Sequence, residues 1–145
     1  MGGIDKIRRH ILACDRGMAA LEFVLLAPAL LMLAFAIIVY SFYFSAQMGI
    51  RHAASEGARA AMAGLGSAER TTLATTRASQ VLASYGSLLS ANGGPTVTTS
   101  AAGTGTFKVL ISYNMMGSPI MRYGRFIPLP ASTITASAVV TNGSY

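Results

Sequence analysis

The spacing of apolar and polar positions changes along the chain, and each change predicts a different element. From Phe23 to Phe44 the chain is continuously apolar except for Ser41. As a helix, these 22 residues would be about 33 Å long, and the hydrocarbon core of a bilayer is about 30 Å thick. The run therefore predicts a helix that spans a membrane.

The helical pattern continues beyond this run. Residues 45–64 are rich in alanine, and small residues recur there at every fourth position: Gly49, Ala53, Gly57 and Ala61. Small side chains at this spacing form a flat seam that a second helix can approach closely. We expect this small-residue seam to pack on the protein's own later helix or sheet, with packing between subunits as the alternative.

The rest of the chain predicts a second helix and a small sheet. Apolar residues repeat at helical spacing from about Ser67, the expected N-cap, to Ser90. After Pro95 the period becomes two, which predicts strands over residues 96–102, 106–114 and 132–141. A long loop with three prolines separates the last two strands. The predicted fold class is α+β, in which a long N-terminal transmembrane helix extends into a domain with a second helix and a three-stranded antiparallel sheet.

Composition supports a membrane protein. Hydrophobic residues make up 52% of the 145 positions and charged residues 11%, which is too apolar for an ordinary small soluble domain. Four of the eleven basic residues precede Gly17, and basic residues in front of a membrane helix predict a cytoplasmic N-terminus. The other basic residues are scattered, whereas a nucleic-acid-binding face needs a basic stripe. We therefore expect no nucleic-acid partner.

No catalytic or metal-binding pattern stands out. The single cysteine, Cys14, cannot form an internal disulfide. His52 has only Glu56 nearby at helical spacing, whereas zinc takes about three or four protein ligands. No glycine-rich phosphate loop follows a strand, and no nucleophile lies beside a base. We expect a structural protein without a cofactor or metal, rather than an enzyme.

The start of the apolar run carries the most specific motif. It reads DRG followed by MAALEF. A short basic segment therefore ends at Gly17, and the pair of Glu22 and Phe23 follows shortly after it. This junction resembles the precursors of type IV pilins, which are cut after a glycine and carry a glutamate at the fifth mature position. The glutamate–aromatic pair, the chain length and the alanine-rich helix are similar to TadE-like minor pilins (pseudopilins) of the tight-adherence (Tad/Flp) pilus system.

The resemblance gives Glu22 a role. Cutting after Gly17 would create a positively charged amine on Met18, and Glu22 lies one helical turn away. The carboxylate could pair with this amine in its own subunit or, as the resemblance implies, in the next subunit, where the pair would fix the register of a filament. The alternative is that Glu22 only reaches the cytoplasmic interface and that Gly17 breaks the helix.

The resemblance also implies an organisation and a set of partners. Residues 1–17 would be a basic leader, 18–44 the transmembrane helix, and 45–145 an exported pilin-like domain. The protein would lie in the bacterial inner membrane with its C-terminal domain in the periplasm or outside the cell. Its partners would be the lipid bilayer, a prepilin peptidase, other pilin and pseudopilin subunits, and the assembly platform of an adhesive pilus.

Two other interpretations stay open. Residues 34–36, AFA, fit a signal-peptidase site, and a cut there would release a secreted protein beginning at Ile37. An uncut, signal-anchored binding domain is the second. In the proline-containing loop, Arg122, Tyr123, Arg125 and Phe126 are a possible contact for a partner subunit or a surface, although a solvated loop tip is the common case.

Overall fold

The computed structural model describes residues 15–103, 105–125 and 127–141. Residues 1–14, which belong to the predicted leader, lie outside the described residues, and so does Phe126. The chain divides into two units, residues 1–38 and residues 39–145, and each is considered by itself. We call the second one the C-terminal unit.

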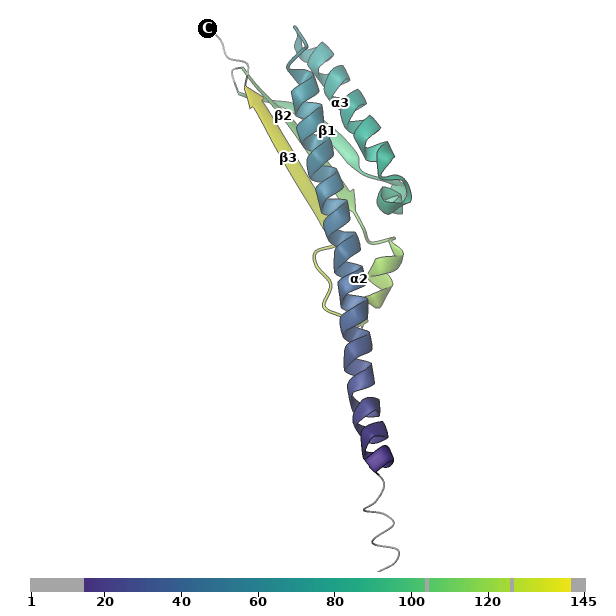
Figure 1. The fold of residues 1–145 in the computed structure, drawn as a ribbon. Coiled ribbons are helices and arrows are strands. Elements are labelled where there is room, and N and C mark those ends of the chain that lie inside the picture. The colour runs from purple at the N-terminus through teal and green to yellow at the C-terminus, as the bar shows by residue number, and fades with distance from the viewer. Residues whose placement is uncertain (1–14, 104, 126, 142–145) are drawn as a thin grey trace, which may run out of the picture. The chain divides into compact units, whose positions relative to one another are not determined.

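The long helix α2 runs from Asp15 to Ala61 without interruption and includes Pro28 (Figure 1). Its first part holds large apolar side chains that are exposed throughout. From Val39 onward the helix belongs to the C-terminal unit, and there its buried positions are mostly alanine and glycine. This helix is long and apolar enough to cross a membrane.

The second helix, α3, spans Ser67–Ser84. Its N-cap is Gly66, and Ser67 is the first helical residue, so the predicted cap is off by one position. The Glu69 carboxylate accepts a hydrogen bond from the Leu65 backbone N–H at 2.9 Å, which satisfies a donor just before the helix.

α3 ends earlier than the periodicity predicts. Gly86 has a φ of +49°, a conformation that stops an α-helix and suits glycine. The chain continues in two short 3₁₀ helices, η1 (Gly86–Leu89) and η2 (Ala91–Gly93). Leu89 is still buried and Leu88 still packs against the core, so the apolar spacing predicted the burial of these residues but not their helix type.

Three strands form an antiparallel sheet in the order β1-β2-β3. They are β1 (Thr96–Gly103), β2 (Thr106–Asn114) and β3 (Thr133–Thr141). β2 pairs with β3 without a break from Thr106–Thr141 to Asn114–Thr133, whereas the β1–β2 pairing shifts between Ala101 and Gly103. The predicted α+β class, with a second helix and a three-stranded antiparallel sheet, is confirmed.

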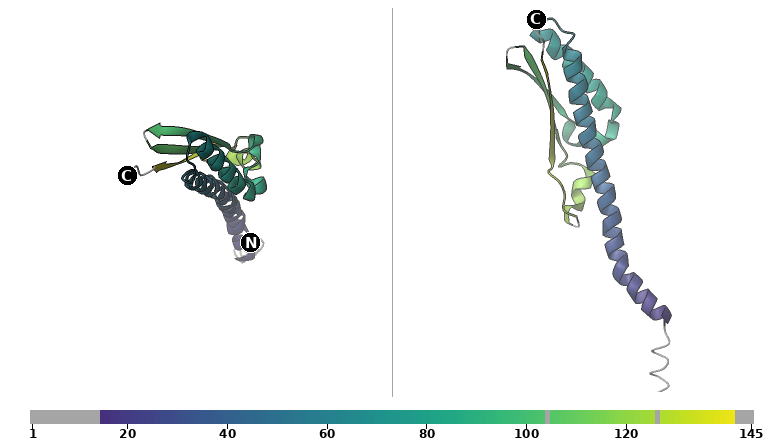
Figure 2. Two further views of the ribbon diagram at one scale, coloured as in Figure 1. Left: turned by 90° about the horizontal axis from the view of Figure 1, so that it is seen from above. Right: turned by 60° about the vertical axis from the view of Figure 1, so that its left-hand side comes forward.

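Both helices lie on the same side of the sheet in the C-terminal unit, as the view from above shows (Figure 2). The core lies between the helices and this face of the sheet. Side chains at alternate positions of β2 are buried because successive residues of a strand point to opposite faces. These four residues are Phe107, Val109, Ile111 and Tyr113. The Tyr113 hydroxyl donates to the Leu88 carbonyl at 3.3 Å and accepts from the Ala91 N–H at 3.2 Å, which ties the 3₁₀ turns to the sheet.

The described residues of the stretch 115–131, which lies between β2 and β3, are more structured than the predicted loop. It contains the 3₁₀ helix η3 (Pro119–Arg125). Met115 is fully buried, and its N–H donates to the Ser132 carbonyl at 2.8 Å. We call these residues the β2–β3 segment.

Candidate functional site

The four junction residues lie on the N-terminal part of α2. Gly17 and Met18 fall within the helix, because α2 already begins at Asp15. The side chains of Met18, Glu22 and Phe23 are exposed, with 71% of Met18 and 67% of Phe23 accessible.

Glu22 is an isolated carboxylate in an apolar surface. It is the only acidic residue between Asp15 and Glu56. Within the described part of the chain it has no hydrogen-bond or ion-pair partner. The neighbouring exposed side chains are large and apolar, among them Leu21, Val24, Leu25 and Leu26. Glu22 lies four positions after Met18, one helical turn along α2.

The small-residue seam lies inside the C-terminal unit, and all four of its residues are buried. A Cβ atom at Gly49 would be 3.0 Å from the Tyr85 ring. At Gly57 it would be 3.0 Å from the Ala74 carbonyl oxygen and 3.2 Å from the Ala78 Cβ. The seam therefore lets α3 and its C-cap approach α2 at distances that larger residues would prevent.

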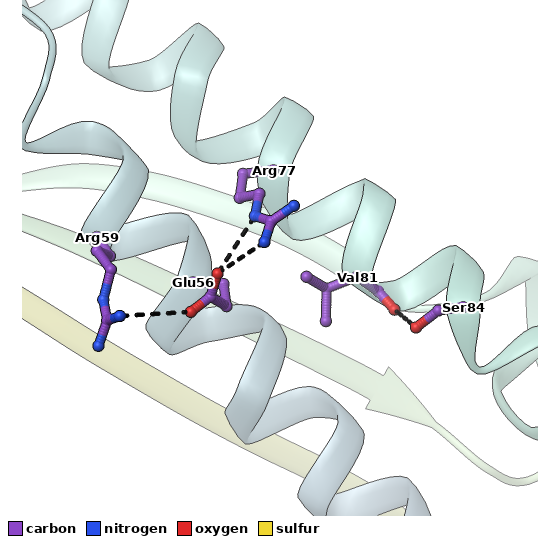
Figure 3. A network of polar contacts seen from close by, with 5 residues as sticks. All are labelled: Glu56, Arg59, Arg77, Val81 and Ser84. Atoms are coloured by element: carbon purple, nitrogen blue, oxygen red, sulfur yellow. Dashed lines mark hydrogen bonds and ion pairs between the residues drawn. The ribbon is translucent and has the colours of Figure 1, made fainter.

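One ion pair joins the same two helices, and the sequence pattern did not point to it. Arg77 on α3 donates to the Glu56 carboxylate on α2 at 2.9 Å, and Arg59 lies 4.0 Å from the same carboxylate (Figure 3). The hydrogen bond from Arg77, together with the charges of Arg77 and Arg59, lowers the pKa of Glu56. Glu56 and Arg77 are 21 positions apart, so only the packing of α3 on α2 reveals the pair.

The residues predicted as a partner loop lie in η3 and just after it. Arg122 and Tyr123 are exposed, and the Tyr123 carbonyl accepts a hydrogen bond from the Ile127 N–H at 3.2 Å. The Arg125 backbone ends η3, and its side chain and Phe126 lie outside the described residues. A second contact, also missed from sequence, joins the Tyr40 hydroxyl to the Pro128 carbonyl at 2.7 Å.

The described residues contain no group of three or more His, Cys, Asp or Glu side chains that could hold a metal ion. Two other features of the described residues stand out. One is Glu22 in the exposed apolar half of α2, and the other is the contact surface between α2, α3 and the sheet.

These features define a class of protein with one apolar anchor helix that continues into a small α+β domain. Comparison with known families is more specific. The model of the TadE-like protein family matches residues 17–59, which confirms the resemblance seen at the junction. The match begins at Gly17 and covers nearly all of α2 but neither α3 nor the sheet. No match was found among curated proteins or among solved structures.

Proposed function

We propose that this protein is a minor pilin, or pseudopilin, of a Tad/Flp-type pilus, that a prepilin peptidase cuts it after Gly17, and that it takes part in assembling a pilus used in adhesion. It is a single-pass protein of the bacterial inner membrane with its C-terminal unit on the outer side. One observation supports this most directly: Glu22, the only acidic residue between Asp15 and Glu56, lies in the exposed apolar half of α2, five residues after Gly17 and one turn after Met18.

The position of Glu22 has a physical reason under this proposal. A carboxylate costs about 2.5–3.5 kcal/mol at the centre of a membrane helix on insertion scales. Glu22 is near the helix end, where the cost is smaller, but it would need a partner once neighbouring helices exclude water from it. Cleavage supplies one, because an α-amino group has a pKa of about 7.7–8.0 and is mostly protonated at neutral pH. The new helix N-terminus also favours a negative charge within its first turn.

We further propose that Glu22 pairs with the Met18 amine of a neighbouring subunit. In the assembled state the exposed apolar side chains of α2 would pack against other helices, which removes water from both charges. An intersubunit pair then fixes the axial register, because sliding one subunit would leave two buried charges unpaired. Pairing within one subunit would set no such register.

The cut is tested by replacing Gly17. Gly17→Leu places a large side chain at the proposed cleavage position and should leave the full-length precursor in membrane fractions. Ala20→Leu, on the other side of the proposed cut, adds a side chain of the same size and should be processed normally. Normal processing of Gly17→Leu in cells with an active prepilin peptidase would show that the cut lies elsewhere.

The pairing is tested by moving the carboxylate. Glu22→Gln should insert into the membrane but fail to enter pili, measured by the amount of subunit in sheared pilus fractions. The double variant Glu22→Gln/Leu26→Glu restores a carboxylate one turn later, about 6 Å along the helix. If register matters, this variant should also fail to enter pili. Normal incorporation of either variant would contradict the proposed pair.

A further inference from the structure

The β2–β3 segment is fixed to the part of α2 where the apolar run ends. The Tyr40 hydroxyl donates to the Pro128 carbonyl at 2.7 Å. Val39 and Ile127 are both buried, and Ile120 and Met121 pack against the core. In the C-terminal unit this segment lies beside α2 at the end opposite to the turn that joins α2 and α3 (Figure 1).

Tyr40 itself belongs to the apolar run. The run continues to Phe44, four residues or about 6 Å further along the helix. A bilayer is about 30 Å thick in its hydrocarbon core and about 40–45 Å with its headgroups, and the run from Phe23 is about 33 Å long. If the run spans the membrane, Tyr40 lies near its outer boundary, and so does the segment that is bonded to it.

The aromatic residues around this level support that placement. Tyr40, Phe42, Tyr43 and Phe44 follow one another closely on α2, and the rings of Tyr43 and Phe44 meet edge to face with centroids 5.9 Å apart. Tyrosine is enriched at the membrane–water interface, where its ring is apolar and its hydroxyl reaches polar groups. Here the Tyr40 hydroxyl reaches a carbonyl of the β2–β3 segment instead of a lipid headgroup.

The composition of the segment suits the surface of an anionic bilayer. Residues 115–131 contain apolar and aromatic residues and two arginines but no acidic residue. From Arg70 to Tyr145 the chain has no acidic residue at all. Met116 is 70% exposed, and Arg122 and Tyr123 are exposed as well. Basic residues among exposed apolar and aromatic side chains are typical of surfaces that bind anionic lipids.

We propose that the β2–β3 segment contacts the anionic lipid surface on the outer side of the membrane, so that the protein meets the bilayer at a second place besides its anchor helix. This inference rests on the membrane-spanning role of α2 in the proposed function. It is independent of cleavage and of the pairing of Glu22.

The absence of tryptophan from the sequence makes the contact measurable. Tyr123→Trp and Met116→Trp place single probes in the segment, and having two guards against one of them disturbing the fold. Leu65→Trp is the matched control, because Leu65 is 95% exposed and lies in the turn between α2 and α3. Leu31→Trp, in the exposed apolar half of α2, reports insertion of the anchor.

The full-length variants would be reconstituted into phosphatidylcholine vesicles with and without phosphatidylglycerol, and quenching by brominated lipids would be measured. We expect strong quenching at position 31 and a blue shift with clear quenching at 116 and 123, larger in anionic vesicles. Position 65 should stay unquenched. In the Met116→Trp background, Arg122→Glu should reduce the quenching, whereas Arg51→Glu, an exposed arginine on α2, should not.

The probes distinguish a failure of the proposed lipid contact from a failure of the proposed membrane anchor. Quenching at position 31 without quenching at 116 and 123 would leave the anchor intact and overturn the lipid contact. Absence of quenching at position 31 would overturn both the anchor and the contact that depends on it. A response at 116 and 123 that requires added pilus subunits would assign the segment to a protein partner and overturn the lipid contact.

Discussion

The two halves of α2 have opposite surfaces although they form one continuous helix. Residues 15–38 expose large apolar side chains, including Leu21, Leu30 and Phe35. Residues 39–61 bury small ones, and Ala46, Ala53 and Ala61 are fully buried. The first half thus exposes a large apolar surface, whereas the second half is covered by α3 and the sheet.

This difference shows that side-chain size along a helix indicates what surrounds it. Leaving a Leu, Ile or Phe side chain in water instead of burying it costs about 1.5–3 kcal/mol. A run of such residues therefore needs a lipid or protein environment. Small residues contribute little burial by themselves, but they allow the close approach that buries larger partners such as Tyr85 and Val109.

The largest expected effect comes from shortening one apolar side chain in each half of α2 and comparing the two variants. Ile50→Ala removes a fully buried side chain and should lower the free energy of unfolding of the C-terminal unit by about 2–5 kcal/mol. Leu31→Ala, at a position 60% exposed, should leave it unchanged. Urea unfolding of the full chain in detergent, followed by the near-ultraviolet circular dichroism of tyrosine, measures both. Similar losses in the two variants would contradict the division of α2.

The next effect tests the close approach at the small-residue seam. Gly57→Leu should lower the free energy of unfolding by about 1–3 kcal/mol, because even a Cβ there meets the Ala74 carbonyl oxygen at 3.0 Å. Ser55→Leu adds the same side chain on an exposed position of the same helix and should change stability by less than about 0.5 kcal/mol. An unaffected Gly57→Leu variant would mean that α3 does not pack closely on α2 in solution.

A smaller effect concerns the place where the two halves of α2 meet. Tyr40→Phe removes the hydroxyl that donates to the Pro128 carbonyl and should reduce the free energy of unfolding by about 0.5–1.5 kcal/mol. Tyr43→Phe is the control, because the Tyr43 hydroxyl has no hydrogen-bond partner among the described residues. Equal stabilities of the two variants would show that the Tyr40 bond does not hold the β2–β3 segment.

The smallest effect is the pH dependence from Glu56. Because Arg77 lowers the pKa of Glu56 in the folded state, the unfolded state binds more protons as the pH falls below the usual value of about 4.3. This stabilisation is therefore present above that value and is lost as the pH falls through the lowered folded pKa. In Arg77→Ala the free energy of unfolding should fall less steeply as the pH is lowered below the usual pKa of Glu56. Arg51→Ala should keep the steeper dependence on pH. The same pH dependence of the free energy of unfolding in both variants would contradict the ion pair.

Most of the fold could be predicted from periodicity. The period of two over residues 106–114 agrees with the burial of Val109 and Ile111, and the helical spacing from Ser67 agrees with the burial of Ala74 and Ala78. The helix type after Tyr85 could not be predicted from periodicity, because it depends on the backbone geometry. The apolar spacing continued past Tyr85, but the positive φ of Gly86 turned the chain into a 3₁₀ helix.

The contacts between distant residues could not be predicted in the same way. Glu56 and Arg77 meet only because α3 packs on α2, and Tyr40 meets Pro128 only because the β2–β3 segment folds back. The junction residues behave differently. Gly17 and Glu22 were found from their order alone, since their proposed roles depend on a peptidase and on neighbouring subunits rather than on contacts within this chain.

The central claim is that the exposed half of α2 begins, in the mature protein, at Met18. The most direct test is the N-terminal residue of the protein from membrane fractions of cells with an active prepilin peptidase, determined by intact mass and terminal sequencing. We predict a chain that starts at Met18. A chain that starts at Ile37, or one that retains Met1, would contradict the account.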